Sequence, residues 1–392
     1  MMLWFYDCRT ISPTFPIIKA ITKNFNRCHH RTTSAATPAI PRELLNKAAY
    51  IQVSFCELSE TGVFLNVSLD LKLIEPHDSF MIRSLLKEAD ALTYRVQFEY
   101  SPVYELLLSF MIYSRRKWTR NLEIGSSWLK ETDELFGPRR KAESGALTED
   151  TFDRLFLLAY LSPNKQDVPS YLDWLSSLSP GQLYELLSPQ ALGSLPSDLG
   201  EDMERSVTLL RAWNELYFRA FLTEWEPTAL ASLAEKQATA VPDPVAQVEL
   251  ATGGLVMEPN DRITTMILVP AQHFRPLNLY AIYRSIAIIL YPVDPPELPD
   301  APPTTVLRAT RALSDDSRLR ILRFLAPSPR SFTEVVAFSG LSKGTVHHHM
   351  MALRSAGLIR THLIGEQYQQ ERFSIRLDGL DECTEALKSY MK

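Results

Sequence analysis

Three consecutive histidines, His347, His348 and His349, are the most chemically suggestive side chains of this 392-residue sequence. Imidazoles are common metal ligands, but neighbouring residues of a helix point about 100° apart, so three in a row cannot converge on one ion. The stretch from Ser342 to Ser355 has helical spacing, with Ser342 as its N-cap. We therefore expect His347 and His348 to point away from the packed side and His349 to lie at its edge, with no metal bound.

The helix expected from Ser342 to Ser355 has two unlike faces. At about 100° per residue, Val346, Met350 and Leu353 fall on one side and must pack into a core. The other side is small and polar near its N-terminal end, where the second helix of a helix-turn-helix unit contacts base edges. We expect DNA contacts from this face and from the hairpin that follows. The candidates are Ser342, Lys343, Gly344, Thr345, His347, His348, Met351 and Arg354 on the helix, with Arg360 and Arg372 on the hairpin.

The elements around this helix complete a winged helix-turn-helix pattern over residues 304–392. Gly340 supplies the turn before the helix, because a left-handed conformation costs glycine least. Ser314 is expected to cap an earlier helix, and Gly365 to form the hairpin turn. Arg376 shares the hairpin strands with Arg360 and Arg372, and the sequence leaves open which of them reaches a phosphate. The expected elements are helices at 306–313, 314–325, 332–338 and 342–355, strands at 358–364 and 372–377, and a last helix at 380–390.

The charge balance of this C-terminal region agrees with a nucleic-acid partner. Residues 304–392 hold 13 Lys or Arg against 9 Asp or Glu, a net charge of +4. The whole chain carries −5, which leaves −9 for the other 303 residues. This local positive excess has the sign needed for contact with phosphates.

Three segments of the C-terminal region closely resemble the ArsR-type winged-helix regulators: Ala312–Leu322, Phe332–Val335 and Leu341–Ile359. The resemblance covers about 85 residues and implies a homodimer, built on the first and last helices of the domain, that binds a pseudo-palindromic operator in double-stranded DNA, most simply as a repressor. Metal-sensing members carry paired cysteines on the third helix or Asp and His ligands on the last. Here the third helix carries none, and the last has only Cys383. We therefore expect no metal effector.

Residues 92–291 predict a second, mostly helical domain with a small sheet, so the fold class is α+β and mainly α. Residues 94–98 alternate as a half-buried strand does, and Ser101-Pro102 begins a helix. The segment Tyr94–Ser109 is similar to the long N-terminal half of a subgroup of these regulators, which implies no known ligand. Further helices are expected at 151–161, 168–178, 180–187, 201–225 and 227–240, and strands of one sheet at 254–258, 263–269 and 285–291.

Two segments are expected to lie outside the domains. Residues 292–303 contain six prolines with three acidic residues and predict a semi-rigid, solvated linker. Residues 1–91 show no sustained pattern and are expected to be either poorly ordered or outside the fold. One hypothesis is that translation starts at Leu92 and that the upstream part is an extension of the gene model.

The sequence contains no nucleophile motif, phosphate loop or paired-carboxylate pattern, so it predicts no enzyme and no cofactor. The aromatic residues from Trp213 to Trp225 are expected to pack a core rather than line a ligand pocket. His273 stands alone in a loop and is expected to be structural.

Cysteine spacing and hydropathy suggest a setting for the protein. The cysteines have no CxxC spacing, and no stretch is long and apolar enough for a membrane span, so we expect a cytoplasmic protein without membrane contact. The helical domain is expected to sense an unidentified small-molecule or protein effector, or to support dimerisation. The alternative is a protein-interaction module in which the winged helix contacts a protein partner.

Overall fold

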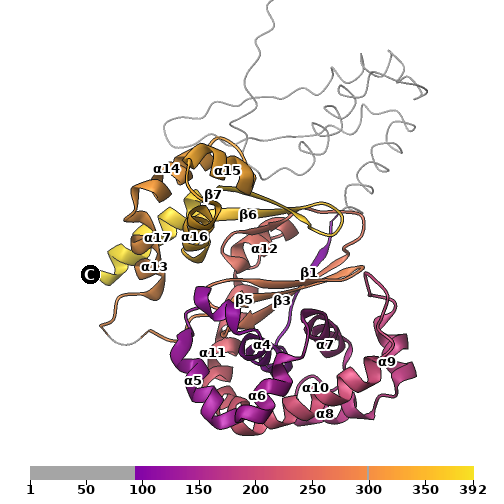
Figure 1. Cartoon of the computed structure of the whole chain (residues 1–392). Helices are drawn as coiled ribbons and strands as arrows, with labels where there is room; N and C mark the ends of the chain where they lie inside the picture. The colour runs from indigo at the N-terminus through magenta and orange to yellow at the C-terminus, as the bar shows by residue number, and fades with distance from the viewer. Residues whose placement is uncertain (1–92, 298–299) are drawn as a thin grey trace, which may run out of the picture. The chain divides into compact units, whose positions relative to one another are not determined.

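The computed structural model describes residues 93–297 and 300–392 (Figure 1). The predictions for residues 1–91 and the strands considered there lie outside this range. Residues 93–297 are called the N-terminal domain below, and residues 300–392 the C-terminal domain. The mainly helical α+β class is confirmed.

A four-stranded sheet forms the centre of the N-terminal domain. Its order is β1-β3-β5-β4, with β1, β3 and β5 parallel and β4 antiparallel at one edge. The two central strands are long apolar runs buried throughout most of their length, as parallel strands between two layers are. The bounds are β1 (Arg95–Phe98), β3 (Thr265–Ala271), β4 (Leu279–Ile282) and β5 (Ile286–Pro292).

The two faces of this sheet belong to different apolar clusters. Ile267 and Val269 of β3 point into a large cluster formed with most of the helices. Met266 and Leu268, which alternate with them, point into a smaller cluster on the other face. Figure 1 shows the sheet between the larger group of helices and α12 (Pro244–Thr252) with the C-terminal hairpin.

The helices of the N-terminal domain begin with well-formed N-caps. The Ser101 hydroxyl accepts from the backbone N–H of Val103, and α4 (Pro102–Ser114) then runs through the large cluster almost fully buried. Ser179 and Gln182 form a capping box for α9. The remaining elements are η4 (Arg116–Asn121), α5 (Gly125–Phe136), α6 (Pro138–Gly145), α7 (Glu149–Leu161), α8 (Val168–Ser177), α9 (Pro180–Leu187), α10 (Leu199–Trp213), η5 (Asn214–Phe218) and α11 (Arg219–Ala238).

The two helices predicted at 201–225 and 227–240 are in fact one continuous helical run. A π-helical turn, η5, interrupts it between α10 and α11, and α11 continues through Pro227. The break expected at this proline is therefore wrong. The helices α5, α6 and α12 and the edge strand β4 were not predicted.

The C-terminal domain has the predicted element order. Its elements are α13 (Thr304–Leu313), α14 (Asp316–Leu325), α15 (Phe332–Ser339), α16 (Lys343–Ser355), β6 (Ile359–Ile364), β7 (Gln370–Ile375) and α17 (Leu377–Tyr390). We call the hairpin of β6, its turn and β7 the wing. One cap is corrected: Asp315, not Ser314, caps α14 by accepting from the N–H of Arg318.

The strand predicted at 254–258 belongs to a different sheet from the one expected. It forms β2 (Leu255–Met257), which pairs in parallel with β6 of the wing in the order β2-β6-β7. The hydrogen bonds from Thr361 N–H to Gly254 O, 2.8 Å, and from Glu258 N–H to Leu363 O, 3.1 Å, extend this ladder. The prediction that all these strands share one sheet is therefore wrong for β2.

The burial of Leu363 provides a stability test of this arrangement. Leu363 of β6 is fully buried in the smaller cluster of the N-terminal domain, whereas Leu319 of α14 is 48% exposed. We expect Leu363→Ala to lower the free energy of unfolding by about 2–5 kcal/mol in urea titrations, and Leu319→Ala to change it by less than about 0.5 kcal/mol. Equal effects of the two substitutions would contradict the placement of the wing in this core.

Candidate nucleic-acid interface

A tight turn sets the position of α16 relative to α15. Ser331 and Glu334 form a capping box at the start of α15, and Gly340 ends that helix in a left-handed conformation at φ 67°. Ser342 then caps α16, and its hydroxyl accepts from the N–H of Thr345 at 3.2 Å. The helix-turn-helix geometry therefore follows from local capping and one glycine.

The two faces of α16 are divided as the spacing predicted. Val346, Met350 and Leu353 are buried in the core of the C-terminal domain. Lys343, Gly344, Thr345, His347 and His348 are exposed, together with the capping Ser342. The exposed N-terminal half of α16 therefore presents a cation, hydroxyls and two imidazoles on one accessible surface.

His349 connects α16 to the start of α14. It is buried, as predicted for the edge of the packed face, and its Nδ1 lies 4.0 Å from Oδ1 of Asp315. The pKa of Asp315 is lowered first by the hydrogen bond from the backbone N–H of Arg318, and electrostatic interactions with His349 and Arg318 act in the same direction. This carboxylate therefore both caps α14 and faces α16.

Met351 lies off the face of α16 that packs in the core of the C-terminal domain, as predicted, but it is not exposed. It is partly buried and packs against the large apolar cluster of the N-terminal domain. Arg354, one turn further along, is also partly buried. Because another part of the chain packs at Met351, the accessible surface of α16 is confined to its N-terminal half.

Two of the three arginines predicted on the hairpin, Arg360 and Arg376, donate hydrogen bonds to carboxylates of other elements. Arg360 donates to Glu249 of α12 and to Asp378 of α17. Arg376 is buried, donates to Glu382 and to Gly357 O, and lies 3.8 Å from Glu249. Sequence spacing predicted a strand position for both, which holds for Arg360, whereas Arg376 follows the end of β7. It could not show the carboxylates that face them.

Arg372, by contrast, remains exposed. Its guanidinium donates to Pro329 O at 3.2 Å and lies 3.9 Å from Glu334. Of the two hairpin arginines in the predicted contact set, it is therefore the one on the solvent side.

An ion cluster that the sequence did not reveal joins α13 to the N-terminal domain. Arg308 of α13 donates to Glu123 and Asp294, and Arg275 lies 3.1 Å from the same Asp294. Burial lowers the pKa of Arg308, but its hydrogen bonds to Glu123 and Asp294 outweigh this and raise it. Asp294, expected in a solvated linker, is instead a shared partner of two arginines.

His273 lies in a buried network, which agrees with its expected structural role. Glu105 accepts from the backbone N–H groups of Gln272 and His273, at 3.0 and 2.9 Å, and pairs with His273 Nδ1. His273 Nε2 lies 2.6 Å from the hydroxyl of Tyr217, which also accepts from the indole N–H of Trp128. The network ties α4, α5 and η5 to the loop that follows β3.

The aromatic residues near Tyr217 pack as a core. Trp213 and Phe218 are fully buried, and Trp225 is 3% exposed. Trp213 contacts Phe110, Tyr113 and Phe136 with ring centroids 4.8–5.6 Å apart. These contacts belong to the large cluster of the N-terminal domain.

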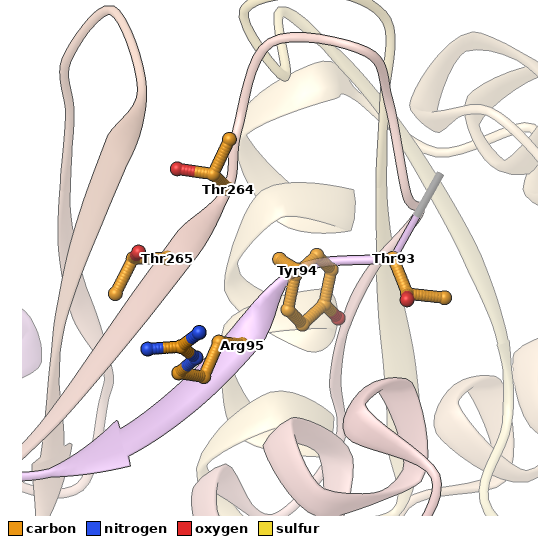
Figure 2. A pocket seen from close by; sticks show the side chains of 5 residues that line it. All are labelled: Thr93, Tyr94, Arg95, Thr264 and Thr265. Carbon is orange, nitrogen blue, oxygen red and sulfur yellow. The ribbon is translucent and has the colours of Figure 1, made fainter. Parts of the chain in front are cut away.

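A polar hollow of about 400 Å³ lies at the start of β1 and β3, and Figure 2 shows its lining side chains. They offer three hydroxyls, a phenol and one guanidinium: Thr93, Tyr94, Arg95, Thr264 and Thr265. Within residues 93–297 and 300–392, no group of three or more His, Cys, Asp or Glu side chains is placed to hold a metal ion. Across the same residues, no helix has the length and apolar composition of a membrane span.

Comparison with known proteins identifies the C-terminal region. Residues 313–362 match the model of a helix-turn-helix domain family. The C-terminal domain is a winged helix-turn-helix domain. The match to a helix-turn-helix family agrees with the pattern predicted for residues 304–392.

A curated relative and several solved structures resemble part of the chain. A Streptomyces lividans protein described as a probable mercury resistance operon repressor is 32% identical over 71 residues, which are 18% of this chain and 57% of the relative. The match thus spans a little over half of that protein. An ArsR-like transcriptional regulator from Rhodococcus sp. RHA1 is 22% identical, covering 22% of this chain and 77% of its own, with a TM-score of 0.20. A homodimeric winged helix-turn-helix DNA-binding domain from Mycobacterium bovis is 24% identical, covering 22% and 77%, with a TM-score of 0.18.

The pKa of Asp315 predicts an acid sensitivity of the winged helix-turn-helix domain. A carboxylate with a depressed pKa contributes stability that is fully present above its ordinary value of 3.8 and is lost as the pH falls through the folded value. Asn caps helices as well as Asp does but does not titrate. We expect Asp315→Asn to leave the melting temperature nearly unchanged at neutral pH and to reduce its fall below pH 3.8 in thermal unfolding series. The same acid-induced fall in both proteins would show that Asp315 does not contribute in this way.

Proposed function

We propose that the chain is a DNA-binding transcriptional regulator of the repressor type, which binds a pseudo-palindromic operator as a homodimer. The observation that carries this proposal is the exposed N-terminal half of α16, the second helix of the helix-turn-helix unit. In such units this part of the helix enters the major groove and contacts base edges. The similarity of part of the chain to a protein described as a probable repressor supports repression rather than activation.

The proposed contacts follow from the chemistry of this surface. Lys343 at the start of α16 supplies a cation to a phosphate or base, and the hydroxyl of Thr345 and the imidazoles of His347 and His348 supply hydrogen-bonding groups for base edges. Gly344 allows close approach of the backbone, and the N-terminal end of the helix dipole favours a phosphate near Ser342. Arg372 is positioned for an outer phosphate.

The C-terminal helix supports the proposed dimer. Leu377 and Tyr390 of α17 and the following Met391 are exposed apolar side chains, with Met391 72% exposed. These side chains lie at the two ends of α17, so a partner helix running along its whole length could contact all three. A second copy of α17 would cover them and would give the two recognition helices the two-fold symmetry of the operator.

The N-terminal domain is the proposed place of effector action. Its contacts with the DNA-binding domain include the strand pair β2–β6 and the ion cluster around Arg308. A small molecule or protein that binds the N-terminal domain differently in two conformations would shift the position of α16 through these contacts. We place the protein in the cytoplasm, where it meets its operator.

Lys343 provides the test of this function. With DNA from the region upstream of its own gene, the protein should show a retained complex in gel-shift assays, and log affinity should fall linearly with log salt concentration. Lys343→Ala should weaken binding and reduce the magnitude of the salt slope by about 1. Lys130→Ala, at an exposed lysine of α5, is the matched control and should change neither quantity.

Two outcomes would contradict the proposal. The first is the absence of a retained complex with the upstream DNA across a range of salt concentrations. The second is equal behaviour of Lys343→Ala and Lys130→Ala. Either outcome would favour the alternative function, in which the winged helix-turn-helix domain binds a protein partner.

A further inference from the structure

The segment of residues 254–262, which we call the anchor segment, holds the wing along its whole length. It begins with β2, which fills the outer edge of β6 in the register Leu255↔Thr361 to Met257↔Leu363. In a free hairpin this edge would present unpaired N–H and C=O groups. The wing of this chain is therefore a three-stranded sheet to which the N-terminal domain contributes one strand.

The backbone at the start of the anchor segment is fitted closely to the wing. Gly254 has φ 125°, and a side chain there would meet Ile359 O at 2.8 Å. Glycine is required on both counts, because other residues rarely adopt this φ and a Cβ would push the strands apart. The Tyr94 hydroxyl also donates to Met257 O at 2.8 Å, so β2 is tied from its other side to the residue before β1.

Side chains of the wing complete a core of the N-terminal domain. Leu363 of β6 and Tyr368 of the wing turn are buried in the cluster that contains Met257, Leu268 and Ile289. Tyr368 adopts a positive φ of 53°, a conformation that is uncommon for a non-glycine residue and needs support from its surroundings. Freeing the wing would expose this apolar surface to water.

Polar contacts hold the tip and the outer strand of the wing. Asn260 donates to Gly365 O at 3.3 Å, and Arg262 pairs with Glu366 at 2.9 Å. On β7, Glu371 accepts from the hydroxyl of Tyr280 at 3.1 Å. The tip, which in a winged helix reaches the minor groove or the flanking backbone, is thus in contact with the N-terminal domain.

We propose that the tip and the β6 strand of this wing form an internal docking element rather than a DNA-contacting one. They fix the winged helix-turn-helix domain to the N-terminal domain, and α16 contacts the operator without a minor-groove contact from the wing tip, while Arg372 on β7 keeps its proposed contact with an outer phosphate. This inference rests on the proposed function. It assigns Arg360 to the interface between the domains, as a positioning residue between Glu249 and Asp378, and removes it from the set of phosphate contacts.

Chemical footprinting of the wild-type protein tests the inference directly. Dimethyl sulfate methylates N7 of guanine in the major groove and N3 of adenine in the minor groove, so it reports the two grooves separately. With DNA from the region upstream of its own gene, we expect protection at guanine N7 positions and unchanged methylation of adenine N3 in the flanking sequence. Protection of flanking adenine N3 would overturn the inference, whereas loss of all protection would overturn the proposed function instead.

The Arg360–Glu249 pair provides a second, independent measurement. For Arg360→Met, Glu249→Gln and the double variant, we expect the magnitude of the salt slope of DNA binding to equal that of the wild type, whereas Lys343→Ala reduces it by about 1. We also expect each single variant to have a lower melting temperature than the wild type. The double variant should melt no lower than the less stable of the two single variants, because the two side chains act together.

Contrary outcomes of this measurement are equally specific. A smaller salt slope for Arg360→Met, with no change for Glu249→Gln, would show that Arg360 contacts a phosphate and would overturn the inference. Additive losses of melting temperature would show that the two side chains do not act together at the interface. If Arg360→Met does not fold, Glu249→Gln and the footprint of the wild type still decide the question.

Discussion

The pairing of β2 with β6 is the contact on which the arrangement of the described chain depends. β6 contributes to two cores at once, because Ile359 lies in the core of the winged helix-turn-helix domain and Leu363 in that of the N-terminal domain. The two residues are four positions apart on one strand, so they project to the same face and neither core can shift without moving the other. Strand β6 of the winged helix-turn-helix domain is thus the central strand of a three-stranded sheet to which both domains contribute.

A second connection acts at the other end of the C-terminal domain, where Arg308 of α13 is held by Glu123 and Asp294. Buried ion pairs add little net stability because desolvation offsets the attraction, but removing one partner is costly. Their effect here is to select one orientation of α13. A strand pair and an ion cluster, at two separate points, fix the orientation of a domain more fully than either would alone.

The sequence revealed the elements whose signals are local. The faces of α16, its Ser342 cap and the Gly340 turn depend on spacing within a dozen residues, and the structure has them as predicted. The assignment of β2 failed because a three-residue apolar strand carries no signal for its partner, which lies more than 100 residues away. The carboxylates that hold Arg360 and Arg376 were invisible for the same reason. Pro227 marks the opposite case: it is a local signal for a helix end, but α11 continues through it.

A fixed wing changes how a regulator of this kind can discriminate its operator. A wing whose tip contacts DNA gives each half-site a second group of contacts. In the proposed complex, the wing contributes only Arg372, and the base contacts come from the N-terminal half of α16. In the proposed dimer, affinity then depends on simultaneous binding of two recognition helices to half-sites about 34–36 Å apart. Because α16 packs on β6, and β6 is paired with β2, a displacement of the anchor segment moves α16 with it and is not absorbed by a flexible linker. In the proposed dimer, an effector would therefore release the operator by changing the spacing of the two helices.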